Sequence, residues 1–196
     1  MEPFTCLFVR HAVLVDLNRA LYALHRRNGL AYTIEASNQP MEMDTVPRPA
    51  YPSQMLIGSV NAAWSVVRGN SVFDFSAVAQ ALSKLFAVRA IAVRSNPHAD
   101  LRALTMFESG RRVRALCWRA GSYTVDEGTR LPGEPSTSPV RFLDDDFVKL
   151  IQSCGVPCDV RTALKRLHAS YIAIKDDDNR SSSVSGEELD QLLTGS

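Results

Sequence analysis

The sequence lacks the features that mark several common classes of protein. Its 22 lysines and arginines almost balance its 21 aspartates and glutamates, so the formal net charge is only +1. Without a basic excess, the chain has no electrostatic footprint for binding nucleic acid. It also lacks an apolar run near the ~18 residues that a membrane helix requires, and its first residues do not resemble a signal peptide. We therefore expect a cytosolic protein with neither nucleic acid nor membrane among its partners.

Cysteine is scarce, and the chain lacks the common catalytic motifs. Cys6, Cys117, Cys154 and Cys158 sit mostly in apolar surroundings, which is typical of buried reduced thiols rather than disulfides. The Cys154 and Cys158 spacing would suit zinc, but the four histidines are scattered and supply no second pair of ligands. A phosphate-binding glycine loop, a nucleophile elbow and a metalloprotease motif are all missing from the sequence. We therefore predict no catalytic residues.

What the chain does contain is typical of a globular protein, with 45% hydrophobic and 22% charged residues. Residues 4–9 are apolar apart from Thr5 and predict an opening strand. Asp16 is suited to cap a helix that ends near Asn28 and Gly29, and residues 30–34 predict a second strand. The first part of the chain therefore has a β-α-β order.

The clearest fold signal lies between Trp64 and Trp118. Apolar residues recur at helical spacing after Asp74, so one face of a helix over 74–86 should lie on a core. Three strand-like runs follow, and residues 108–111 (Glu-Ser-Gly-Arg) are typical of a hairpin turn. These runs span residues 88–94, 101–107 and 112–119.

These patterns predict an α+β fold with a mixed, mostly antiparallel sheet in the order β-α-β and then β-α-β-β-β, with helices packed on it. The proline-rich residues 37–56 predict a long connection. Acidic residues open a helix over 143–151, and a second helical pattern runs from Asp159 to Ile174. We expect an α+β domain over 1–142, with C-terminal helices and an acidic, serine-rich tail over 143–196 packed on the same core.

The predicted hairpin carries basic residues that are candidates for binding a partner. Alternation along 112–119 places Arg112 and Arg114 on one face with Leu116 and Trp118. With Arg111 they could bind a phosphate or an acidic partner, or they could simply protect a sheet edge from aggregation. Asp126 and Glu127 follow at the end of a strand and lack the spacing of an acid–base pair. We interpret Arg111, Arg112, Arg114, Asp126 and Glu127 as partner-binding residues.

The tail over 177–188 resembles an EF-hand calcium loop. Its oxygen ligands would come from Asp177, Asn179, Ser181, the Ser183 carbonyl, Ser185 and Glu188. Ser182 stands where such loops normally require glycine. Only two of the ligands are carboxylates, so any affinity for Ca²⁺ should be weak. The alternative is a serine-rich linker before a short helix, in which Ser185 and Glu188 form a capping box. Apart from this calcium ion, we expect no cofactor.

Several stretches together resemble a loosely defined set of small bacterial proteins, some of which look like immunity proteins of toxin systems. The similarity covers residues 56–155 and rests on Trp64–Gly69, Leu82-Ser83, Phe107–Arg114, Asp126–Gly128 and the acidic helix start at Asp144. The resemblance implies a cytosolic protein that occludes a cognate toxin and has no active site of its own. A calcium-responsive regulatory module and an enzyme of unrecognised type are the alternatives.

Calorimetry separates the two interpretations of the tail. A calcium loop predicts heat on titration with Ca²⁺, and it predicts that Glu188→Gln abolishes this heat because the bidentate carboxylate is lost. A capped linker predicts no heat in either protein, and that result would remove calcium from the account.

Overall fold

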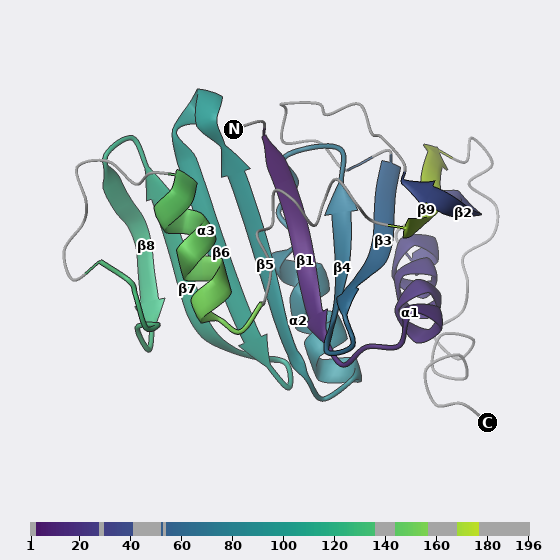
Figure 1. Cartoon of the computed structure of the whole chain (residues 1–196), viewed down its shortest axis with the longest axis horizontal. Helices are drawn as coiled ribbons and strands as arrows, with labels where there is room; N and C mark the ends of the chain where they lie inside the picture. Colours follow the sequence, from purple (N-terminus) through teal and green to yellow (C-terminus); the bar gives the residue numbers. More distant parts are fainter. Residues whose placement is uncertain are drawn as a thin grey trace.

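In a computed structural model, residues 3–27, 30–40, 52, 54–135, 144–156 and 168–176 are described. Nine strands form one sheet in the order β2-β9-β3-β4-β1-β5-β6-β7-β8 (Figure 1). The α+β class predicted from the sequence is confirmed. All pairings described are antiparallel, so this part of the sheet is more uniform than the mixed sheet that the sequence predicts.

The strands are β1 (Phe4–Arg10), β2 (Leu30–Pro40), β3 (Gln54–Asn61), β4 (Trp64–Gly69), β5 (Arg89–Asn96), β6 (Leu101–Glu108), β7 (Arg111–Arg119), β8 (Ser122–Gly128) and β9 (His168–Asp176). The helices within the described residues are α1 (Leu14–Arg27), α2 (Ser76–Leu85) and α3 (Asp144–Ser153), with a 3₁₀ turn at Pro97–Ala99. The predicted opening strand, the helix over 74–86 and the hairpin at 108–111 are thus present, with small shifts at their ends.

Strand β1 lies inside the sheet and is buried on both faces. Cys6 and Phe8 point into the core beneath α3, whereas Leu7 and Val9 point into the core beneath α1 and α2. Helix α3 lies in front of β6 and β7, and α2 lies behind the sheet (Figure 1). Because successive side chains of a strand point to opposite faces, a strand covered on both sides must be apolar throughout. This explains why residues 4–9 are apolar apart from Thr5, whose buried hydroxyl donates to the carbonyl of Phe73.

Residues 168–176 correct the prediction of a helix that continues to Ile174. They form β9, which lies between β2 and β3 and pairs with both. The sequence over 171–174, Tyr-Ile-Ala-Ile, is aromatic and β-branched, which suits a strand as well as a helix. Two neighbouring strands supply the backbone hydrogen bonds, and this tertiary pairing outweighs the helical spacing of the apolar residues.

Gly128 ends β8 in a position that only glycine can occupy. Its φ is +90°, and a Cβ there would lie 2.2 Å from the carbonyl oxygen of Val113 on β7. Gly133 has a similar φ of +83°, but a Cβ there would meet nothing within 4 Å. An alanine at Gly133 would therefore add backbone strain alone, whereas an alanine at Gly128 would add both strain and a steric clash.

We expect Gly133→Ala to lower the free energy of unfolding by about 1–2 kcal/mol, the cost of a left-handed alanine. Gly128→Ala should cost about 1–3 kcal/mol more, because the added methyl forces β7 and β8 apart. Urea denaturation of both variants measures the difference. Equal losses would show that the two strands are not this close.

Candidate functional site

The predicted partner-binding residues gather at one end of the sheet, on β7 and β8. Strand β8 ends the strand order, and among the described strands it pairs with β7 alone. Arg111, Arg112, Asp126 and Glu127 are exposed there. An edge strand offers backbone groups to a second chain, and natural proteins commonly protect such an edge with charged side chains.

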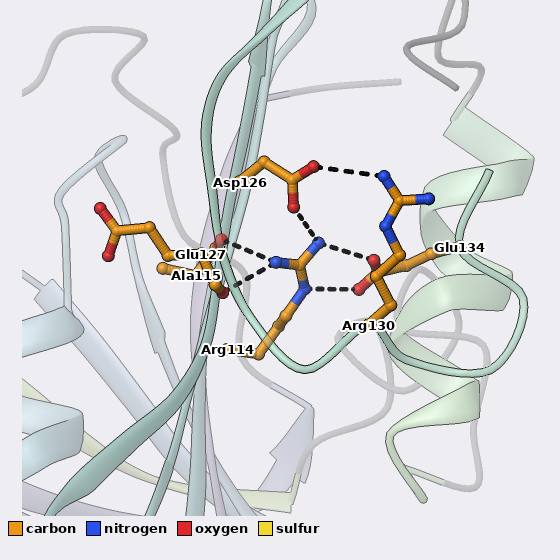
Figure 2. Close-up of polar contacts among 6 residues, drawn as sticks. All are labelled: Arg114, Ala115, Asp126, Glu127, Arg130 and Glu134. Atoms are coloured by element: carbon orange, nitrogen blue, oxygen red, sulfur yellow. Dashed lines mark hydrogen bonds and ion pairs between the residues drawn. The ribbon is translucent and has the colours of Figure 1, made fainter. Parts of the chain in front are cut away.

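Arg114 is the exception, because its side chain is only 1% exposed. Its Nε and Nη2 atoms donate to the two carboxylate oxygens of Glu134 at 2.7 and 2.6 Å, a bidentate pair (Figure 2). Nη2 also donates to Asp126 Oδ1 at 2.6 Å, and Nη1 donates to the carbonyl of Glu127 at 2.7 Å. The interpretation of Arg114 as a surface contact is therefore wrong, because its guanidinium is buried and already bound to Glu134, Asp126 and the carbonyl of Glu127.

A β-bulge explains why Arg112 and Arg114 differ in exposure. Arg114 lies opposite Met106, but Arg112 lies opposite Phe107, which leaves Val113 as an extra residue on β7. An extra residue shifts the alternation of side chains, so Arg112 and Arg114 lie on opposite faces of the sheet. Met106 belongs to the core beneath α3, and Arg114 is buried on that side.

The charges around Arg114 balance. Arg114 and Arg130 carry two positive charges, while Asp126 and Glu134 carry two negative ones, and Arg130 Nη2 lies 3.5 Å from Asp126 Oδ2. The hydrogen bonds that Arg114 donates to Glu134 raise the pKa of Arg114, and the hydrogen bond that it donates to Asp126 lowers the pKa of Asp126. Burial raises the pKa of Tyr123 beside them. The four charges of the cluster thus sum to zero, and each of them lies against a charge of opposite sign.

Arg112 and Glu127 remain available to solvent. They form an ion pair at 2.5 Å, but their side chains are 55% and 56% exposed. An exposed pair of this kind is screened by salt and contributes less than about 1 kcal/mol, so it can be exchanged for a partner's charges at little cost. Arg111, next to it at the hairpin, is also exposed.

The described residues also bear on the remaining chemical predictions. Cys154 is buried, and desolvation raises its pKa to about 12, so its thiol stays protonated and is a poor nucleophile. Across these residues no three His, Cys, Asp or Glu side chains gather closely enough to hold a metal ion. The calcium ligands predicted over 177–188 and Cys158 lie outside the described residues. No helix in the described ranges has the length and apolarity to span a bilayer.

No protein-family model, curated protein or solved structure matches the chain. The resemblance to immunity proteins therefore stays a prediction.

Sequence reasoning missed Glu134, which is the main partner of Arg114. The residue stands in a segment rich in proline and glycine, where a single acid gives no sign of being buried. Its side chain is nevertheless only 2% exposed. The one available signal was an arginine between apolar residues on β7, because a buried cation requires a carboxylate from elsewhere in the chain.

We expect Arg114→Met to lower the free energy of unfolding by about 3–5 kcal/mol, because Glu134 would be left buried without its cation. Replacing both residues, as Arg114→Met with Glu134→Leu, should restore most of this loss. Arg112→Met is the matched control on the same strand, and it should cost less than about 1 kcal/mol. Urea denaturation measures all three, and equal losses from the two single variants would contradict the assignment.

Proposed function

We propose that this protein is a non-enzymatic cytosolic immunity protein, which binds a cognate bacterial toxin or effector and neutralises it by occlusion. The contact surface is the β7–β8 edge, defined here as Arg111, Arg112, Asp126 and Glu127. The observation that supports the proposal is that this edge carries exposed charges of both signs on a backbone fixed from within by Arg114.

A fixed edge suits a protein that works by binding. Arg114 joins β7 to β8 through Asp126 and the Glu127 carbonyl, and it joins both strands to the following segment through Glu134. A surface that is ordered before binding loses little conformational entropy on association. The protein can therefore use most of its contact energy for affinity.

The exposed charges would set which partner is accepted. Arg111 and Arg112 lie on one strand, and Asp126 and Glu127 lie on the next, so positive and negative side chains run side by side. Complementary charges on a partner speed its approach, and mismatched charges exclude the wrong partner. In this account the toxin is inactivated because the bound edge covers the toxin's own working surface.

The direct test is co-expression with the product of the neighbouring gene. We expect a stable complex and survival of the host cell. Arg111→Glu with Arg112→Glu should weaken binding at least about tenfold, a loss of about 1.4 kcal/mol, because both charges are reversed.

Arg19→Glu is the matched control for this charge reversal. Arg19 is an exposed arginine on α1, and its side chain is 73% exposed. This variant should bind and protect as the parent protein does. Failure to form a complex, or equal weakening by the control, would contradict the proposed surface.

A further inference from the structure

A second charged feature lies at the ends of β1, β5 and β6, apart from the Arg114 cluster. It is an open hollow of about 440 Å³. Its lining comes from the end of β1, the turn after α2, the start of β5 and the β6–β7 hairpin. The lining residues are Arg10, His11, Ala87, Val88, Arg89, Glu108 and Ser109.

The strand register brings two arginines side by side in this hollow. Val9 and Ala90 are the last paired residues at this end of β1 and β5, and Arg10 and Arg89 are the next residues along the two strands, where both line the hollow. Arg89 in turn pairs with Glu108 on β6. Side chains at opposed positions of antiparallel strands lie on the same face, with Cβ atoms about 5 Å apart. Two positive charges and one negative charge therefore share one face of the sheet.

Arg89 is held in a fixed orientation. Its Nε donates to Glu108 Oε1 at 2.9 Å, its Nη2 donates to the same oxygen, and its Nη1 donates to the carbonyl of Cys154 at 3.3 Å. A guanidinium carries five N–H groups, so two of them remain for another acceptor. The side chain is 31% exposed, which leaves it within reach of a ligand.

Among the described residues, the positive charge of Arg10 is not balanced by an ion pair. Its side chain is exposed, and within the described part of the chain its guanidinium makes neither an ion pair nor a hydrogen bond. Like charges at opposed strand positions are destabilising. The side chains of Arg10, Arg89 and Glu108 together carry a charge of +1. A bound anion would neutralise this charge and relieve the repulsion between the two arginines.

Several residues that line the hollow have a positive φ. His11, Ala87 and Ser109 have φ values of 53°, 52° and 48°, and they are three of the five non-glycine residues with positive φ among those described. Ser109 lies in a two-residue hairpin turn, where positive φ is expected. Ala87 and His11 occupy turns where glycine would avoid the cost, and backbone of this kind is found preferentially at binding sites.

We propose that this hollow is a binding site for a small-molecule oxyanion, held between the guanidinium groups of Arg10 and Arg89. Arginine binds carboxylate and phosphate groups through paired N–H donors, so the shared ligand chemistry is an oxyanion with two or more acceptor oxygens. The proposal does not depend on the toxin partner, because it concerns the isolated protein.

The test is an NMR titration of the full chain with inorganic phosphate and, separately, with acetate, at constant ionic strength set by sodium chloride. We expect a saturable shift of the Arg10 and Arg89 side-chain Nε–H signals. Arg10→Gln should weaken binding about tenfold or more, since a charged hydrogen-bonding group is lost. This variant should fold normally, because no described side-chain contact depends on Arg10.

Arg19→Gln is the control, an exposed arginine on α1 outside the hollow, and it should bind as the parent does. Saturation by phosphate alone would assign phosphorylated ligands, and saturation by acetate alone would assign carboxylic acids. Saturation by both supports the site without choosing between them. The proposal is overturned if neither anion saturates, or if the Arg10 and Arg19 variants bind equally.

Discussion

The buried ion pair between Arg114 and Glu134 is the interaction on which this end of the protein depends. A guanidinium that is removed from water needs a carboxylate in contact with it, because an unpaired buried charge is far more costly than a lost surface contact. Arg114 meets this need with Glu134 and Asp126, and it also binds the Glu127 carbonyl. One side chain therefore ties β7, β8 and the segment that follows β8 into a single unit.

The edge held by Arg114 belongs to a sheet whose central strands are covered on both faces. One core lies beneath α1 and α2, the other lies beneath α3, and β1 contributes to both. Such a sheet deforms little, since its interior is packed on both sides. The exposed charges at the β7–β8 edge and the hollow around Arg10 both lie on this rigid support, so either site can be ordered before a ligand arrives.

The sequence predicted the local elements well and the long-range contacts poorly. The apolar run of β1, the amphipathic α2 and the Ser109-Gly110 turn each carry their own signal, and each appears where expected. The burial of Arg114 depends on the bulge at Val113, which simple alternation cannot reveal. Glu134 and β9 depend on partners far away in the chain, and no local pattern encodes those partners.

Hydrogen–deuterium exchange of the Arg114→Met variant tests the central role of Arg114 most directly. If Arg114 fixes the edge, exchange should accelerate over residues 122–135 while the amides of β1 and β4 keep the rates of the parent protein. Unchanged exchange over 122–135, or equal acceleration across the whole sheet, would contradict the claim that this one side chain holds the β7–β8 edge in place.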